Sequence, residues 1–322
     1  MIVDDADLVR RYGGSVSGVL FDRKIEVFRA EGVDGVIPYR HGLGCAVAVG
    51  DPICSREDTP RLARAFRDEC VRHHRHTVYV VASEPFARWA TSEGYAALEF
   101  GRELIVDPRR DPLAGHAQQA LRGKVHRAIR AGVVAAEYAP NGARDEELER
   151  AIERAVAVWL SARHGPQAYL TPFLPFAGRA CKRWFYARAG GGIVGVMQLL
   201  RLDAYGGYLL SQLVSTPDAP PGTTELLGVT ALRALCASGC AWATWGPAPL
   251  PELGAVTGFG ARSERVCRFL FRNAGRTFGL EARNVYHRKF PVAETVGSYL
   301  LFNPPRIGAG DVIELLHAFH AA

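Results

Sequence analysis

The residues of this chain that are best placed to do chemistry stand at the start of a predicted helix in its second half. The turn Pro220-Pro221-Gly222 is followed by Thr223 and Thr224, either of which is a typical N-cap, and Glu225 falls in the first helical turn. The free N–H groups at such a helix start suit an anionic group or a carbonyl oxygen. Glu225 either takes part in that chemistry or only balances the positive end of the helix.

The elements that follow this helix start are predicted to build a cleft. The helix has one buried side and ends near Gly239, because its apolar residues recur at helical spacing at Leu227, Val229, Leu232 and Leu235. A short apolar strand is predicted over Ala241–Trp245, and it breaks into the turn Gly246-Pro247.

The positive charge of the chain is concentrated in two blocks. The formal net charge is +6, a modest excess for 322 residues. The first block contains six basic residues against one acidic residue, namely Arg109, Arg110, Arg122, Lys124, Arg127 and Arg130. The second, between Arg262 and Phe290, contains eight basic residues against two acidic ones. Such blocks indicate contact with a polyanion, although an ordinary solvated basic face has the same composition.

Length and composition bound the class of protein. Hydrophobic residues make up 48% and charged residues 22%, which is typical of a globular protein, and 322 residues suffice for two domains. The chain has no apolar run of membrane-spanning length, and its acidic N-terminus does not resemble a signal peptide. Seven scattered cysteines predict a reduced, cytoplasmic protein. The run His73-His74-Arg75-His76 does not present its ligands on one helical face, so we predict no metal site.

The order of predicted elements indicates an α/β (α+β) fold made of two copies of one unit. Strands and helices alternate around a mixed sheet in the first hundred residues, and a similar order returns in the second half. We place the two domains at residues 1–112 and 113–322, with an amphipathic basic helix over Asp111–Gly132 joining them. Finer expectations are strands or connecting segments over Ser15–Phe21, Cys267–Phe271 and Ser298–Phe302, and a last helix over Asp311–His320.

Four motifs in order resemble the C-terminal synthase domain of phosphatidylglycerol lysyltransferases. They are AVAVGDP over 46–52, LRGKVHRAIRAG over 121–132, TWGPAPL over 244–250 and NVYHRKFP over 284–291. The resemblance implies tandem GNAT-like domains, each with a mixed, mostly antiparallel sheet flanked by helices, joined by a basic helix. It also implies that aminoacyl-tRNA is the co-substrate, without a separate cofactor. Fem-type transferases, which build peptidoglycan bridges, are related in fold and donor.

The chain departs from that family in three ways. Its sequence contains no multi-span membrane half, and no arginine stands three positions after the acidic residue in Glu225-Leu226-Leu227-Gly228. The segment Arg163–Ala168 also differs from the expected Phe-x-Leu-Gly run. The acceptor therefore stays open between an amine, hydroxyl or hydroxylamine of a small molecule, such as a natural-product intermediate, and a lipid headgroup.

The resemblance also suggests roles for single residues. Transfer of an aminoacyl group needs the ester carbonyl held beside an acceptor, its oxyanion stabilised and a proton removed. As the catalytic pair, Lys289 could supply positive charge near the ester or the terminal phosphate, and Glu225 could accept the proton or bind an aminoacyl ammonium. The aromatic residues Trp245, Tyr286 and Tyr208 could pack the terminal adenosine, with core packing as the alternative for Trp245. Further predicted substrate contacts are Ser211, Gln212, Asp218, Thr223, Arg283 and Arg288.

The six basic residues of the first block are the predicted tRNA contacts, because Lys and Arg bind phosphate without reading sequence. Our first interpretation is thus a soluble aminoacyl-tRNA-dependent aminoacyltransferase of unknown oligomeric state. An acyl-CoA-dependent GNAT N-acyltransferase would share the fold, but Asp218–Thr223 lacks the usual Arg/Gln-x-x-Gly-x-Gly/Ala cradle for a pyrophosphate. A third alternative is a non-catalytic module that binds RNA or an anionic membrane surface through the basic blocks.

Overall fold

The described part of the chain folds around one long, mixed β-sheet. The computed structural model describes residues 5–42, 44–139, 144–162, 173–278 and 285–307. Its strands are β1 (Glu26–Phe28), β2 (Ile37–His41), β3 (Cys45–Val49), β4 (His76–Ser83), β5 (Ala96–Val106), β6 (Val134–Tyr138), β7 (Lys182–Ala189), β8 (Gly192–Leu202), β9 (Gly207–Ser215), β10 (Ala243–Pro249), β11 (Val256–Thr257) and β12 (Glu294–Asn303).

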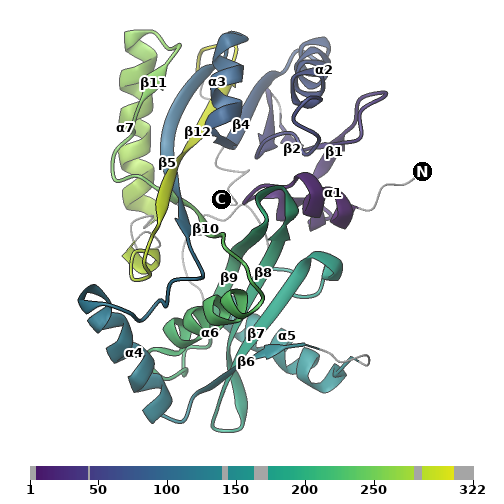
Figure 1. Cartoon of the computed structure of the whole chain (residues 1–322). Helices are drawn as coiled ribbons and strands as arrows, with labels where there is room; N and C mark the ends of the chain where they lie inside the picture. The colour runs from purple at the N-terminus through teal and green to yellow at the C-terminus, as the bar shows by residue number, and fades with distance from the viewer. Residues whose placement is uncertain (1–4, 43, 140–143, 163–172, 279–284, 308–322) are drawn as a thin grey trace.

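Helices cover both faces of this sheet (Figure 1). The α-helices are α1 (Asp5–Tyr12), α2 (Thr59–Arg72), α3 (Glu84–Ser92), α4 (Gln119–Arg130), α5 (Glu146–Ser161), α6 (Thr223–Ala237) and α7 (Ala261–Phe278). Short 3₁₀ helices are η1 (Ser17–Phe21), η2 (His116–Gln118), η3 (Arg179–Cys181) and η4 (Asp203–Tyr205). None of the described helices combines the length and the apolar composition needed to cross a bilayer.

The strand order shows how the two halves of the sheet are connected. Among the described residues it is β1-β2-β3-β4-β12-β5-β10-β9-β8-β7-β6, with β11 paired to β5 outside that path. The halves join where β10 pairs antiparallel with β5. Strand β12 lies between β4 and β5, and Leu301 stands opposite both Tyr79 and Ala97. The division between residues 112 and 113 stays a prediction, and this late strand belongs to the sheet of the early half.

The parallel pair β9–β10 separates after two residue pairs. Ala243 is opposite Tyr208 and Thr244 is opposite Leu209, and the pairing stops there. After an irregularity between Thr244 and Pro247, β10 continues to pair with β5 alone. Within the described residues, β9 therefore has no strand partner on this side beyond Leu209. The candidate functional residues lie around this point, on both faces of the sheet.

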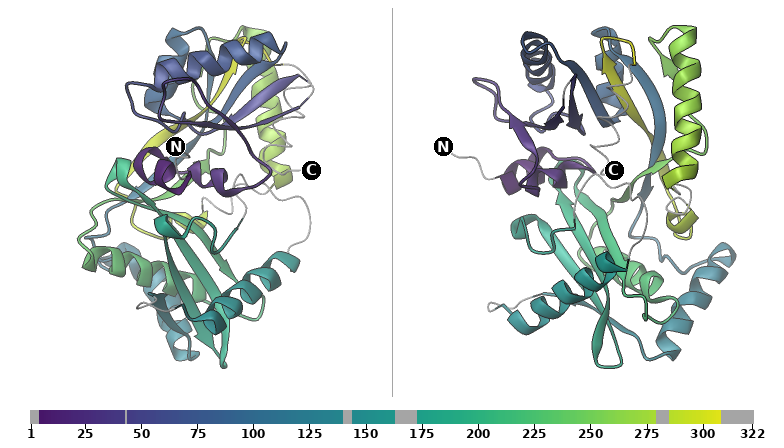
Figure 2. Two further views of the ribbon diagram at one scale, coloured as in Figure 1. Left: turned by 90° about the vertical axis from the view of Figure 1, so that its right-hand side faces the viewer. Right: turned by 180° about the vertical axis from the view of Figure 1, so that it is seen from behind.

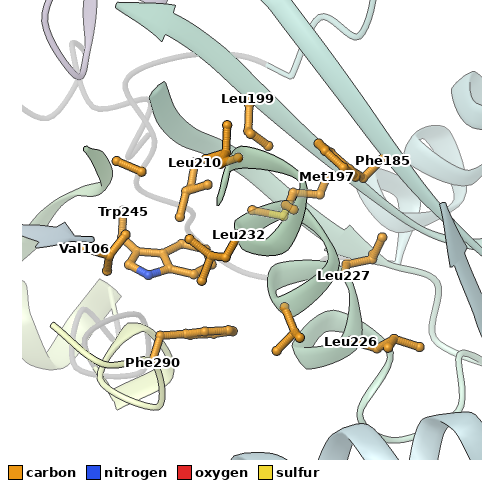
Figure 3. Close-up of a cluster of buried hydrophobic side chains, with 14 of the residues drawn as sticks. Val106, Phe185, Met197, Leu199, Leu210, Leu226, Leu227, Leu232, Trp245 and Phe290 are labelled. Carbon is orange, nitrogen blue, oxygen red and sulfur yellow. The ribbon is translucent and has the colours of Figure 1, made fainter. Parts of the chain in front are cut away.

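Helices α4 and α6 cover one face of the later half of the sheet. Their apolar residues pack with those of β7–β10 in a cluster that also includes Trp245 and Phe290 (Figure 3). Helix α6 has buried residues on more than one side, because it lies between the sheet, α4 and the segment that ends at Phe290. On the opposite face, α5 packs over Trp184 and Val196, and α1 packs over Leu200 and Leu202.

The early half of the sheet is also covered on both faces. Helices α2 and α3 bury Phe66 and Phe86 against Tyr79. Helix α7 covers the other face, where Cys267 and Phe271 pack into the cluster that contains Phe302. Seen from the front and from behind, α7 and α4 lie along the same side of the molecule (Figures 1 and 2).

Three expectations about single elements were wrong, each for a local reason. Residues 17–21 form the 3₁₀ helix η1 instead of a strand. The basic helix begins at Gln119 instead of Asp111, because Gly115 has a positive φ of 85° and turns the chain before it. Residues 267–271 belong to α7, in which the apolar run is shared between an inner and an outer helix face. The closing strand over residues 298–302 is confirmed as part of β12, and the helix expected over residues 311–320 lies outside the described residues.

Candidate functional site

Glu225 is held between two lysines at the start of α6. Oε1 of Glu225 accepts a hydrogen bond from Nζ of Lys289 at 2.9 Å and from Nζ of Lys124 at 3.2 Å. Its Oε2 accepts one from the hydroxyl of Thr224 at 3.0 Å. Glu225 is only 4% exposed, whereas the side chains of Lys124 and Lys289 are 44% and 28% exposed. The carboxylate thus lies underneath, and the two ammonium groups reach solvent.

The three charges change one another's proton affinity. Burial raises the pKa of Glu225, but the hydrogen bond from Lys289 and the positive charges nearby outweigh it, so this pKa is lowered overall. Burial lowers the pKa of Lys289, and Lys124 lowers it further against the pull of Glu225. The pKa of Lys124 is raised, because its ammonium can donate to the Lys289 amine once that amine has lost its proton and because it donates to Glu225. Glu225 is therefore a poor proton acceptor, and Lys289 releases its proton more readily than an ordinary lysine.

The start of α6 is built by a glycine and by the backbone of α4. Gly222 is the N-cap residue, with φ of 96°, and no side chain caps the helix. The expectation of a threonine N-cap was wrong, because the Thr223 hydroxyl instead donates to the carbonyl oxygen of Pro220 at 2.6 Å. A Cβ atom at residue 222 would collide with the carbonyl oxygen of Lys124. The missing side chain lets α4 approach α6 closely enough for Lys124 to reach Glu225.

Aromatic rings surround Trp245 next to this cluster. Trp245 is 1% exposed, and its ring stacks on His287 at a centroid distance of 5.0 Å and contacts Phe290 at 4.7 Å. Nζ of Lys289 lies over the Tyr286 ring, 4.2 Å from its centroid. Burial raises the pKa of the Tyr286 hydroxyl well above its ordinary value. The burial of Trp245 favours core packing over adenosine stacking, while Tyr286 helps to fix the position of Lys289.

Of the other predicted substrate contacts on this face, Tyr208 is not brought to Glu225. Tyr208 packs under Arg183, which also reaches Ser238 beyond the C-terminal end of α6. That end is ~20 Å from Glu225 at the rise of an α-helix. Asp218 is exposed in the turn before α6, and Arg288 is exposed beside Lys289. The prediction for Arg283 lies outside the described residues.

Ser211 and Gln212 line a polar pocket on the opposite face of the sheet. The pocket is small, with room for about one water-sized group, and its lining also includes Phe21, Lys182 and Gln198. Gln198 is 4% exposed, and its Oε1 has no hydrogen-bond partner among the described residues. Burial lowers the pKa of Lys182 to about 8, and its amine donates to the carbonyl oxygen of Leu174 at 2.9 Å.

Lys182 and Gln198 were not predicted from the sequence. The signal for Gln198 is a single polar residue within the otherwise apolar run of residues 193–200 in β8, since a buried amide needs partners that such a run does not supply. No comparable signal marks Lys182. Among the described residues, no group of three His, Cys, Asp or Glu side chains is arranged to hold a metal ion.

Some of the predicted tRNA contacts are bonded to other groups of the chain, and others form no ion pair with a described residue. Arg109 donates two hydrogen bonds to Asp107, at 2.9 and 3.0 Å, and Arg110 lies 3.8 Å from the same carboxylate. Arg122 donates to the carbonyl oxygens of residues 113 and 115, each at 2.6 Å. Arg127 and Arg130 are exposed on the last turn of α4, on the same helix as Lys124. Arg109 and Arg110 are nevertheless exposed as well, so they differ from Arg127 and Arg130 in their pairing with Asp107 and not in their exposure.

Comparisons with known proteins agree with this architecture. A family model described as "Phosphatidylglycerol lysyltransferase, C-terminal" matches residues 6–302. The lysylphosphatidylglycerol biosynthesis bifunctional protein LysX of Gordonia bronchialis is 31% identical over 49% of this chain and 14% of its own length. The MprF-like domain protein Rv1619 of Mycobacterium tuberculosis is 26% identical over 82% of this chain and 55% of its own length. The chain therefore spans about half, or much less, of these two relatives.

A solved structure shows the same fold. L-PGS from Bacillus licheniformis superposes with a TM-score of 0.77 at 17% identity, covering 99% of this chain and 96% of that one. The fold class predicted from the sequence, tandem GNAT-like with a mostly antiparallel sheet flanked by helices, is confirmed. Because the family model matches nearly the whole chain, this protein belongs to the C-terminal domain family of phosphatidylglycerol lysyltransferases, a family of transferases.

Proposed function

We propose that this chain transfers an aminoacyl group from tRNA to a hydroxyl group of a lipid headgroup. The observation that carries the proposal is the cluster in which Glu225 holds Lys124 and Lys289 together where α4 meets α6. Membership of the phosphatidylglycerol lysyltransferase family supports the class of reaction and the lipid acceptor. The name of LysX, a lysylphosphatidylglycerol biosynthesis protein, supports the same acceptor.

In this proposal the two lysines bind phosphate and Glu225 positions them. Their ammonium groups are partly exposed, and both bond to the same carboxylate oxygen, so they present positive charge at one place. Charge-assisted hydrogen bonds of this kind suit the phosphate oxygens at the acceptor end of a tRNA. Glu225 is buried and already accepts three hydrogen bonds, which supports a positioning role instead of proton transfer.

Helix α4 continues the positively charged surface of Lys124 and Lys289 in the direction in which we place the rest of the tRNA. Arg127 and Arg130 follow Lys124 by one and two helical turns and are exposed. Contacts from such residues to the sugar-phosphate backbone position a nucleic acid without reading its sequence. This arrangement supports a tRNA whose terminal phosphates lie at Lys124 and Lys289 and whose stem lies along α4.

The transfer itself exchanges one ester bond for another. The acceptor hydroxyl oxygen bonds to the aminoacyl carbonyl carbon, and the bond from that carbon to the terminal ribose oxygen of tRNA breaks. The proton of the acceptor hydroxyl ends on the released ribose oxygen.

The polar pocket offers a place for a second polar group of a substrate. Gln198 lines it beside Ser211 and Gln212, and the buried carbonyl oxygen of Gln198 has no partner among the described residues. A group that donates a hydrogen bond, such as a hydroxyl or an ammonium, would satisfy this oxygen. The pocket lies on the face opposite the lysine cluster, close to the point where β9 and β10 part.

The start of α6 argues against an acyl-CoA donor. A pyrophosphate bound there would meet the Glu225 carboxylate in the first helical turn. The loop in front of the helix also cannot form an open cradle, because Gly222 is packed against the backbone of Lys124. The alternative of a CoA-dependent acyltransferase therefore lacks a suitable pyrophosphate site at the start of α6.

The test supplies tRNA charged with one labelled amino acid at a time, together with vesicles that contain phosphatidylglycerol. We expect the label of one or a few amino acids to enter the lipid fraction. Lys289→Met should reduce this transfer at least tenfold. Lys24→Met changes an exposed lysine outside the cluster and should leave transfer unchanged. The proposal is wrong if every label stays on tRNA while labelled acetyl-CoA is consumed.

A further inference from the structure

The outer face of α7 exposes large apolar side chains between arginines. Phe269 is 64% exposed and Val266 is 48% exposed. Arg262, Arg265 and Arg272 are exposed at helical spacing from them. At ~100° per residue these five positions fall within one third of the helix circumference. None of the three arginines forms an ion pair with a described residue.

The inner face of the same helix shows that this exposure is not a consequence of loose packing. Cys267 is buried, and Phe271 packs against the same cluster. Arg268 turns inward and donates to Glu264 at 2.9 Å and to the carbonyl oxygen of Leu253 at 2.7 Å. Helix α7 is therefore fixed to the sheet on one side and presents apolar and basic groups on the other.

We propose that the outer face of α7 docks on the surface of an anionic phospholipid bilayer. The charge is complementary, because arginines flank the apolar pair and acyl-chain boundaries lie directly beneath anionic headgroups. Phe269 and Val266 would enter that boundary, while the arginines would bind lipid phosphates. RNA offers phosphates but little apolar surface for Val266, and a protein partner would not require arginine alone among the charged residues of this face.

The position of α7 gives the docking a purpose. The next described residues after α7 begin at Val285, which is 65% exposed, and lead directly to Lys289. Helices α7 and α4 lie on one side of the molecule (Figures 1 and 2). A bilayer bound at α7 would therefore lie on the side of the molecule that carries α4, the helix of Lys124. Only this purpose rests on the proposed function; the docking itself does not.

Vesicle flotation measures the docking directly. We expect the protein to float with phosphatidylcholine vesicles containing about one third phosphatidylglycerol, and not with phosphatidylcholine alone. The triple change Arg262→Gln, Arg265→Gln and Arg272→Gln should weaken binding ~100-fold, at roughly fivefold per arginine. The double change Val266→Ser and Phe269→Ser should weaken it ~10-fold or more.

Two matched controls separate this face from other surfaces. Val158 and Leu160 are 46% and 48% exposed on α5, without a surrounding group of arginines, so changing both to serine should leave flotation unchanged. Arg127→Gln with Arg130→Gln on α4 should weaken it less than the triple change on α7 does. The same α7 variants should still transfer to a short-chain, water-soluble phosphatidylglycerol, while transfer to vesicle lipid falls with binding.

Each other outcome counts against the proposal. Absence of flotation by the unchanged protein, or unchanged flotation of both α7 variants, would overturn it. If the α7 variants lost tRNA binding while still floating, the face would belong to RNA. If they changed only the oligomeric state, the face would be an interface between copies. Failure of transfer to any lipid, with α7-dependent flotation intact, would reject the proposed function and leave the docking in place.

Discussion

The Nζ atom of Lys289 lies 2.9 Å from Oε1 of Glu225, although the two residues are 64 positions apart in the chain. The bond joins the first turn of α6 to the segment that leads into β12. Because Lys124 donates to the same oxygen, one buried carboxylate connects three separate segments. The cluster is therefore both a structural joint and the surface that we propose for phosphate binding.

A double-mutant cycle should measure the structural role of this cluster separately from phosphate binding. Glu225→Gln leaves two ammonium groups facing each other without a countercharge, and we expect it to lower the free energy of unfolding by about 1–3 kcal/mol. Lys289→Met should cost less, because Lys124 still pairs with the carboxylate. Urea unfolding of both single variants and the double variant should give a coupling energy of at least ~0.5 kcal/mol. Additive losses would show that the 2.9 Å contact has no energetic role.

Three glycines test how closely α4 must approach α6. Gly222→Ala introduces a Cβ against the Lys124 carbonyl at a φ of 96°, so we expect a loss of roughly 2–4 kcal/mol in stability. Gly239→Ala, beyond the other end of α6 with φ of 75° and open space around it, should cost only ~1 kcal/mol. Gly123→Ala, inside α4 with open space around it, should stabilise by ~0.5–1 kcal/mol. Thermal unfolding should show this order.

The two exposed arginines of α4 should contribute to tRNA binding. Arg127→Gln with Arg130→Gln should weaken binding, and the slope of log affinity against log salt should fall by about 0.7–0.9 for each phosphate that the variant no longer binds. Arg109→Gln is the matched control, since Arg109 is engaged by Asp107. Filter binding at several salt concentrations measures both. An unchanged slope in the double variant would remove α4 from the tRNA surface.

The sequence predicts α6, the basic helix from Gln119 onward and the later part of β12, because periodicity and Gly/Pro positions act over short distances. It did not predict that Lys124 and Glu225 meet, since they are 101 positions apart. The sequence alone places Lys124 in the tRNA surface and Glu225 in the catalytic pair, and only tertiary packing brings the two together. The error at α7 has a different cause. Its apolar residues serve two opposite faces, so the run around Phe269 resembles a strand.

Acid should weaken the attachment of α5 to the sheet. Glu149 accepts hydrogen bonds from Arg179 at 2.7 Å, Arg144 at 2.6 Å and Tyr138 at 2.7 Å. The hydrogen bonds from Arg179, followed by those from Arg144 and Tyr138, lower the pKa of Glu149 to about 2 against the effect of burial. A lowered pKa in the folded state stabilises the fold above the unfolded value near 4.3, and this contribution is lost as the pH falls toward 2.

The measurement is chemical unfolding between neutral pH and about pH 3. At neutral pH, Glu149→Gln should cost roughly 2–3 kcal/mol, and its difference from the unchanged protein should shrink as the pH falls. Glu153→Gln changes an exposed glutamate on the same helix and should leave the pH profile unchanged. A constant difference between Glu149→Gln and the unchanged protein at all pH values would contradict this explanation.

Gln198 should show a conflict between stability and activity. Gln198→Met keeps the side-chain length and removes a buried carbonyl oxygen that has no partner among the described residues, so the free protein should gain ~1 kcal/mol of stability. If the pocket binds a hydrogen-bond donor of a substrate, the same variant should raise KM or lower kcat at least tenfold. Unfolding and transfer assays on one preparation decide this, because a residue that only packs the core would leave transfer intact.

The position of β12 determines when the early half of the sheet can be completed during synthesis. Strands β4 and β5 are not neighbours, because residues 294–303 fill the space between them. As the chain leaves the ribosome, the edges of β4 and β5 that pair with β12 stay unpaired until nearly two hundred more residues have been synthesised. Such edges can pair with other chains. A premature stop shortly before residue 294 should therefore produce an aggregating polypeptide, even though both lysines of the cluster and Glu225 would be present.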